Sequence, residues 1–309
     1  MFASLFFLLA VTFAETKALA LQVHLDRAGF SCSAIDGVWG PKAERALRAY
    51  VAARAPGDAV PSSPDRAFDR YFADAPDPFR IETVTQADLD ALVSIPDDPA
   101  GRAALPRMGY ETVREMFAER GHLSQIALAK MNPGVDWQNV RPGLKLVIPD
   151  FPPTREEFLA ADRGRPNRPK RPQAELVRIS LSTSSVSAYD ANGRILALFP
   201  CSVAANKKKV PPHGELRITS YVPWPNYTYT PDRAPKGAKA GRYVWPAGEN
   251  SPVGVAWMGL NLPGYGIHGT PRPESIGFTG SHGCFRLANW NAARLFAMCK
   301  SGTKVVIEP

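Results

Sequence analysis

Apolar positions recur at helical spacing in the first part of the chain. Within residues 18–53 they lie three and four apart, which predicts two helices separated by a turn at 35–40. Gly29 suits the end of the first helix, because glycine adopts the left-handed backbone there at little cost. Pro41 suits the first turn of the second helix, where its missing N–H is not needed. The pattern predicts a small helical module over 15–55.

Near residue 174 the pattern changes to an alternation of period two. Residues 176–181 alternate between apolar and polar side chains, and Asn192-Gly193 predicts a tight hairpin turn into a partner strand at 194–203. Further elements are predicted as strands over 214–221, 253–258 and 304–307 and a helix over 290–300. The last 136 or so residues are therefore expected to be mainly β, with few helices.

The middle of the chain is broken up by proline, which makes up 30 of the 309 residues, about twice the average usage. Residues 56–105 are interpreted as a Pro-rich connection with a short helix near 88–93. Residues 106–149 contain two short helical patterns and end in a strand at 144–148. Residues 150–173 are interpreted as a basic, Pro-rich linker that cannot build a core.

The net charge of +8 is unevenly distributed along the chain. Residues 1–162 carry −5, residues 163–172 carry +5 and residues 173–309 carry +8. A basic C-terminal part suggests a polyanionic partner, either nucleic acid or an anionic cell-wall polymer, although a solvated basic surface gives the same count. No apolar run reaches the roughly 18 residues that a membrane span needs.

The first residues resemble a secretory signal. The stretch from Phe2 to Ala14 is apolar except for Ser4 and Thr12, and its length fits the apolar region of a signal peptide. The segment 1–14 is therefore predicted to be a signal peptide and the protein to be exported. A buried first helix is the alternative, since no Lys or Arg precedes the apolar run.

The four cysteines, Cys32, Cys201, Cys284 and Cys299, match no metal-binding knuckle in their spacing. An exported protein could pair some of them. If Cys284 stays a thiol, three remain, so buried free thiols are expected at the other positions.

Two histidines and a cysteine lie in a glycine-rich segment near the C-terminus. Its members are Tyr265, His268, Gly269, Thr270, Ser281, His282, Gly283, Cys284, Phe285 and Arg286. A thiol reacts as its thiolate, so a catalytic cysteine needs a base or a positive charge nearby. Backbone N–H groups at Gly283 could form an oxyanion hole, and Arg286 could hold a carboxylate or lower the pKa of the thiol. A zinc site using His213, His268, His282 and Cys284 is the weaker alternative, because no acidic fourth ligand accompanies them.

This arrangement resembles the catalytic domain of the L,D-transpeptidase (YkuD-type) family, whose pattern HGT…SHGC-hydrophobic-R is present without a gap. The resemblance covers roughly residues 174–309 and includes NSPVGVAW at 250–257 and GTKVVI at 302–307. It implies that Cys284 is the nucleophile, that His268 is the general base, and that the Gly269 carbonyl orients the imidazole.

The same resemblance implies roles for the neighbouring residues. His282, Gly283 and Cys284 would line the oxyanion region, Ser281 would brace the turn, and Arg286 and Tyr265 would contact substrate. Phe285 stands where the family more often has Ile or Val. The tract 222–247, rich in Trp and Tyr, would be a lid or substrate wall, or else a solvent-covered loop. No cofactor and no metal are implied.

Two further resemblances concern the N-terminal part. Residues 15–55 resemble peptidoglycan-binding domain 1, with DGxxG after the first helix, and residues 106–149 resemble a βααβ LysM module that binds N-acetylglucosamine-containing glycans, with NPGxDWxxxxPGxxLxIP at the end. The predicted fold is thus multidomain α+β, with a helical module, a LysM-like module and a mainly β, β-sandwich-like catalytic domain. The predicted divisions are 1–14, 15–55, 56–105, 106–149, 150–173 and 174–309.

The resemblances together imply a cysteine L,D-transpeptidase in the periplasm or cell wall of a Gram-negative cell. It would release D-Ala from a diaminopimelate tetrapeptide stem and form 3→3 cross-links in peptidoglycan. Its partners would be stem peptides and glycan strands. Water as acceptor would make it an L,D-carboxypeptidase, and an outer-membrane (lipo)protein amine would make it an anchoring enzyme. A catalytically silent wall-binding protein and a nucleic-acid-binding protein are the rivals from other classes.

Overall fold

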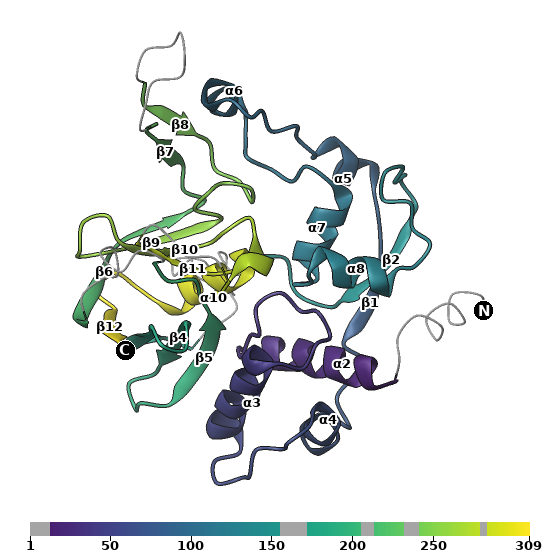
Figure 1. Ribbon diagram of the computed structural model, residues 1–309, viewed down its shortest axis with the longest axis vertical. Coiled ribbons are helices and arrows are strands. Elements are labelled where there is room, and N and C mark those ends of the chain that lie inside the picture. Colours follow the sequence, from purple (N-terminus) through teal and green to yellow (C-terminus); the bar gives the residue numbers. More distant parts are fainter. Residues whose placement is uncertain (1–12, 155–171, 205–212, 232–240, 279–282) are drawn as a thin grey trace, which may run out of the picture.

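The computed structural model of the chain describes residues 13–154, 172–204, 213–231, 241–278 and 283–309. In the C-terminal part, one eight-stranded sheet contains β3 (Leu176–Ser180), β4 (Ser185–Tyr189), β5 (Ile195–Pro200), β6 (Gly214–Pro223), β9 (Ala256–Leu260), β10 (Gly266–His268), β11 (Phe285–Arg286) and β12 (Lys304–Glu308). Their order in space is β11-β10-β9-β6-β12-β3-β4-β5 (Figure 1). The prediction of a mainly β C-terminal domain is confirmed.

This sheet is continuous and is bent at β6. Neighbouring strands are antiparallel except in the pairs β12–β3 and β10–β11. The first residues of β6 pair with β12 and its last residues with β9, and the register shifts between Ile218 and Ser220. Such an irregularity bends a strand and increases its twist. The strands thus form one curled sheet and not the β-sandwich-like arrangement that the sequence suggested. Alternating strands alone do not distinguish two packed sheets from one curled sheet.

Helix α10 (Asn289–Met298) packs in the core of this domain, and all of its residues are buried. Tyr221 of β6 stacks on Phe296 of the helix, with 3.6 Å between the ring centres. A helix at the surface of a domain normally keeps one polar face in water. The complete burial of α10 therefore requires a second layer on its other side, and the N-terminal part of the chain supplies it.

The N-terminal helices are α2 (Phe13–Arg27), α3 (Pro41–Arg54) and α4 (Pro64–Tyr71). Gly29 ends the first of them with φ of +97°, and Pro41 begins the second, as the sequence predicts. A methyl group at Gly29 would lie 3.1 Å from the carbonyl oxygen of Leu196, and Phe30 forms a bridge with Leu198. Both partners belong to β5, so these helices cover an edge strand that would otherwise expose its backbone.

The next unit has the order β1 (Phe79–Thr83), α5 (Gln86–Asp90), α6 (Pro99–Ala104), α7 (Val113–Arg120), α8 (Gln125–Met131) and β2 (Lys145–Pro149). Strands β1 and β2 pair antiparallel over five residues each. The strand that pairs with β2 thus lies inside the stretch 56–105, which the sequence suggested was a connection, and not at the start of 106–149. A strand whose partner is some sixty residues away leaves no local signal beyond a short alternation.

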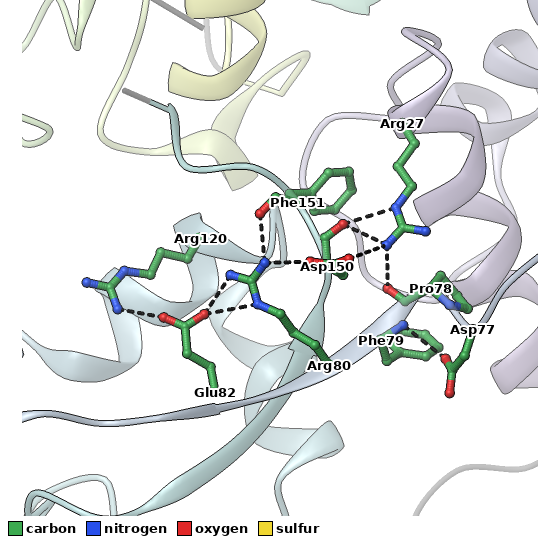
Figure 2. Close-up of polar contacts among 9 residues, drawn as sticks. All are labelled: Arg27, Asp77, Pro78, Phe79, Arg80, Glu82, Arg120, Asp150 and Phe151. Carbon is green, nitrogen blue, oxygen red and sulfur yellow. Dashed lines mark hydrogen bonds and ion pairs between the residues drawn. The ribbon is translucent and has the colours of Figure 1, made fainter. Parts of the chain in front are cut away.

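Ion pairs brace the two strands of this unit, and hydrogen bonds from Arg27 join it to α2 (Figure 2). Arg80 on β1 binds Glu82 and Asp150, both at 2.6 Å. Arg27 at the end of α2 donates to the carbonyl oxygens of Pro78 and Asp150, at 3.2 and 2.7 Å. Pro78 and Asp150 flank the same end of the β1–β2 pair, where Phe79 pairs with Pro149, so Arg27 fastens that end of the unit to α2.

The apolar cores also cross the predicted module boundaries. One cluster joins Leu19 and Ile35 of the helical module to Phe117 and Leu146 of the β1–β2 unit. Another contains Leu21 and Phe30 together with Leu198 of the eight-stranded sheet. The sequence suggested modules tethered by linkers, whereas the described residues form shared cores. Binary patterning shows which residues are buried but not which neighbour buries them.

Other predictions fall partly outside the described residues. Residues 1–12 hold most of the predicted signal peptide, and residues 155–171 hold most of the predicted linker. Cys32, Cys201 and Cys299 are buried free thiols, and Cys284 is a partly exposed one. Among the residues that the structure describes, no helix has the length and hydrophobicity of a membrane span.

Candidate active site

The parallel pair β10–β11 brings the catalytic candidates to one face of the sheet. His268 pairs with Arg286, and Ile267 pairs with Phe285. Side chains alternate along a strand, so His268, Arg286 and Cys284 share one face, while Ile267 and Phe285 point to the other. Those two apolar residues are fully buried in the core. Burial of the apolar face therefore fixes which face carries the thiol and the imidazole.

The imidazole of His268 is held through one nitrogen. Nδ1 lies 2.7 Å from the carbonyl oxygen of Gly269, the contact that the sequence analysis expected. A carbonyl only accepts, so Nδ1 carries the hydrogen and Nε2 keeps its lone pair. Burial lowers the pKa of His268 to about 4, the hydrogen bond to Gly269 opposes this, and the charge of Arg286 lowers it further. The ring is therefore neutral at neutral pH and can accept a proton.

The thiol of Cys284 is half-buried on this face. It donates to the carbonyl oxygen of Gly264 at 3.5 Å. Burial raises the pKa of Cys284, although a backbone hydrogen bond from Gly266 and the charge of Arg286 both lower it. Burial therefore shifts the pKa values of the thiol and of the imidazole in the directions that favour their uncharged forms.

Trp257 forms a flat surface beside the two groups, and the sequence analysis did not single it out. It pairs with His268 across β9–β10, and the two rings stack with centres 5.5 Å apart. Its Nε1 donates to Ser220 at 3.2 Å. A methyl group at Gly266 would lie 2.7 Å from the indole, so glycine is needed there. The signal was present, because Trp257 ends the NSPVGVAW stretch that the family resemblance includes.

The hairpin β7 (Tyr227–Tyr229) and β8 (Tyr243–Trp245) reaches from the sheet toward α6 (Figure 1). Burial raises the pKa of Tyr227, and the charges of Tyr229 and Cys284 raise it further, so Tyr227 lies within electrostatic range of the thiol. Trp245 is buried and donates from Nε1 to the carbonyl oxygen of Pro99 at 3.0 Å. Helix α6 of the neighbouring unit therefore holds this hairpin in place, and its role as a lid or substrate wall stays a prediction.

The structure describes some of the remaining predicted site residues but not others. Ser281 and His282 lie outside the described residues, so their predicted oxyanion and bracing roles stay predictions. Gly283 has φ of +145°, a conformation that favours glycine. Tyr265 is half-buried and packs against the core of the sheet, in the turn before β10. Within the ranges that the structure covers, no group of three His, Cys, Asp or Glu residues is arranged to hold a metal ion.

A cavity of about 580 Å³ lies at the junction of the three parts, and neither His268 nor Cys284 lines it. Its walls include Lys42 of α3, Ile126 of α8 and Phe278 of the loop that leads to Cys284. The ammonium of Lys42 donates to the carbonyl oxygen of Ile276 at 2.5 Å and lies 4.3 Å from the centre of the Phe278 ring. The N-terminal part thus contacts the chain between the two catalytic candidates.

Comparison with known proteins agrees with the chemistry of this face. Residues 174–307 match the family model of the L,D-transpeptidase catalytic domain. A Bacillus licheniformis protein, whose curated name is "Putative L,D-transpeptidase YkuD", is 27% identical over 199 residues, which are 64% of this chain and 94% of that protein. A Fuscovulum blasticum protein, "Putative L,D-transpeptidase in ATP synthase subunits region ORF 5", is 33% identical over 120 residues, or 38% of this chain and 60% of that one.

A solved structure, an L,D-transpeptidase from Mycobacterium smegmatis, matches with a TM-score of 0.35 and 19% identity, covering 44% of this chain and 59% of that chain. The chain therefore spans nearly all of the first relative but less than two thirds of the second relative and of this structure. Residues 174–307 are therefore the part of this chain that is similar to an L,D-transpeptidase catalytic domain.

Proposed function

We propose that the protein is a cysteine L,D-transpeptidase that cross-links peptidoglycan through Cys284. The observation that carries the proposal is the shared face of β10 and β11, where a neutral thiol and a neutral imidazole lie inside a domain matched by the L,D-transpeptidase family model. The partly exposed Cys284 contrasts with the other three cysteines, which are buried. It is the one thiol among the four that a substrate can reach.

The first half of the reaction makes a thioester. Nε2 of His268 accepts the proton of the thiol while Sγ of Cys284 attacks the carbonyl carbon of the L-centre of diaminopimelate in a tetrapeptide stem. Backbone N–H groups near Gly283 stabilise the oxyanion of the tetrahedral intermediate. The C–N bond to D-Ala breaks, and the imidazolium returns its proton to the leaving amine. The acyl group remains on the sulfur.

The second half transfers the acyl group to an amine. The side-chain amine of a second stem attacks the thioester carbonyl, His268 accepts its proton, and the thiol of Cys284 is regenerated. The product is a 3→3 cross-link. Water in place of the amine gives a shortened stem, and a protein amine gives an anchored protein. The helical module and the β1–β2 unit would bind the same wall polymer outside the cytoplasm, which raises the effective concentration of substrate.

Incubation of the purified protein with a disaccharide-tetrapeptide that carries diaminopimelate tests this proposal. We expect cross-linked dimer and released D-Ala by mass spectrometry from the wild type, and neither from Cys284→Ala. Cys201→Ala is the matched control, because it removes a buried thiol of the same sheet domain. Shortened stem without dimer would replace the transpeptidase by a carboxypeptidase. No turnover and no acyl adduct on a reduced thiol would leave a wall-binding protein.

A further inference from the structure

The side chain of Asn289 links the catalytic domain to the β1–β2 unit. Asn289 is the first residue of α10, only a few positions after Cys284, and it is fully buried. Its Nδ2 donates to both carboxyl oxygens of Glu119 on α7, at 3.1 and 3.2 Å, and to the carbonyl oxygen of Glu249 at 3.0 Å. These acceptors fix the orientation of the amide, because a flipped amide would point its oxygen at the Glu249 carbonyl.

The other end of this amide lies behind the residue that orients the catalytic histidine. A methyl group at Gly254 would lie 2.1 Å from Oδ1 of Asn289, and one at Gly269 would lie 2.3 Å from it. The amide oxygen therefore occupies the space that two missing side chains leave. Gly269 is the residue whose carbonyl accepts from Nδ1 of His268 at 2.7 Å. Asn289 thus blocks backward movement of the peptide that holds the imidazole.

Glu119 is suited to holding this amide without bringing a charge to it. The hydroxyl of Tyr110 donates to its carboxyl group at 3.1 Å. Burial raises the pKa of Glu119 to about 8, and the nearby charge of Glu249 raises it further, while its hydrogen bonds with Asn289 and Tyr110 oppose the rise. The carboxyl group is therefore mostly protonated at neutral pH. A glutamine at this position would have nearly the same shape and an oxygen that still accepts from Nδ2.

We propose that Asn289 and, through it, Glu119 are positioning residues that hold the Gly269 carbonyl against Nδ1 of His268. The β1–β2 unit is then part of the catalytic apparatus and not only a wall-binding module, because its helix α7 supplies Glu119. This inference rests on the proposed function, since it assigns a task within the same reaction. It predicts that the catalytic domain without this unit has a poorly oriented base.

A pair of asparagine variants on α10 tests the proposal in the full chain. Asn291 is also fully buried in this helix and also reaches the N-terminal part, where its Nδ2 donates to Ser31 at 2.9 Å. Asn289→Ala and Asn291→Ala therefore remove the same kind of buried contact at two places. We expect kcat to fall about tenfold to a hundredfold in the first, with KM nearly unchanged, because a small misplacement of a catalytic group is costly. The second should keep kcat within about threefold.

The position of the imidazole can be measured by NMR, without an activity assay. In protein with 15N-labelled histidine, the Nδ1–H of His268 should give a slowly exchanging proton signal in the wild type and in Asn291→Ala. The signal should broaden or vanish in Asn289→Ala. Glu119→Gln should restore both the signal and kcat that Glu119→Ala loses, because the glutamine oxygen still accepts from Asn289. These two variants keep the inference testable if Asn289→Ala does not fold.

Two results would overturn the inference. One is an equal loss of kcat in the two asparagine variants, which would mean that both act through stability alone. The other is an unchanged Nδ1–H signal of His268 in Glu119→Ala. If the wild type itself shows no turnover, the proposed function fails, and the proton signal still decides whether Glu119 and Asn289 position the imidazole.

Discussion

Two buried histidines in this protein have different partners, which predict opposite tasks for them. Nδ1 of His268 donates to the neutral carbonyl oxygen of Gly269 at 2.7 Å. His122 places its Nδ1 3.0 Å from a carboxyl oxygen of Asp26, at the junction of the three parts of the chain. A carbonyl fixes the ring but adds no charge, so the imidazole remains a base. A carboxylate brings a negative charge to its histidine and favours a ring nitrogen that donates to it.

The junction around His122 is built for stability. Arg294 of α10 donates to both the backbone and the side chain of Asp26, the latter at 3.3 Å. Burial alone would raise the pKa of Asp26, but His122 and Arg294 outweigh it and hold the pKa below its usual range. Phe151 stacks on the imidazole with ring centres 3.8 Å apart. Three parts of the chain thus meet at one charged cluster, whereas the catalytic face has a neutral pair.

Exchanging each histidine for glutamine should separate these tasks and give the largest effect. His268→Gln removes the proton acceptor, so we expect turnover to fall about 100- to 10,000-fold with little change in the thermal midpoint. His122→Gln keeps a donor for Asp26, so we expect nearly full turnover but a free energy of unfolding lower by about 1–3 kcal/mol. Initial rates and urea unfolding measure the two. A large loss of turnover in a well-folded His122→Gln would contradict the comparison.

Removing the carboxylate from the junction should give the next largest effect. Asp26→Ala removes the buried carboxylate that faces Arg294 and His122, which should cost about 3–5 kcal/mol in urea unfolding. The control is Asp69→Ala, because Asp69 is 59% exposed in its pair with Lys17 and should cost no more than about 1 kcal/mol.

The difference in unfolding free energy between wild type and Asp26→Ala is also expected to change with pH in a definite direction. Because the folded pKa of Asp26 is lowered, its contribution is present above the usual pKa of an aspartate and is lost as pH falls through the folded value. The difference in unfolding free energy should therefore shrink in acid. A difference that is the same at pH 3 and pH 7 would show that Asp26 acts through packing and not through charge.

The smallest expected effect concerns the charge state of the catalytic thiol. Burial raises the pKa of Cys284, so its alkylation by iodoacetamide should keep rising through pH 9, with no plateau near neutral pH. Arg286 lowers this pKa. Arg286→Gln should therefore slow alkylation at pH 8 by about two- to tenfold. Cys284→Ala sets the background, since the other cysteines are buried. A rate that is flat from pH 6 to 9 would indicate a standing thiolate–imidazolium pair.

Local sequence signals predicted the helix starts and ends well. Pro41 begins α3 and Gly29 follows α2, because backbone preferences of single residues act within one turn. The hairpin with Gly193 at φ of +75° follows from the same kind of preference. Strand β1 was not predicted, since its partner β2 is far along the chain and its own residues are half-exposed.

The residues of the candidate site likewise include some that the sequence predicted and some that it did not. Cys284, His268 and Gly269 could be named from the sequence, because rare residue types recur in the spacing of a known catalytic motif. Glu119 could not be named, since a glutamate on a short helix has the sequence pattern of a solvated charge. Its partner Asn289 lies 170 positions away.

The sequence by itself determined the candidate reactive groups of this protein: a thiol, an imidazole and glycine-rich turns in a fixed order, because these depend on residue types that are close in the chain. The tertiary structure decided what surrounds that chemistry. It placed α6 against Trp245, α7 against Asn289 and Asp26 between His122 and Arg294. Those contacts join segments 96 to 268 residues apart, and their free energy appears only when shared burial brings the segments together.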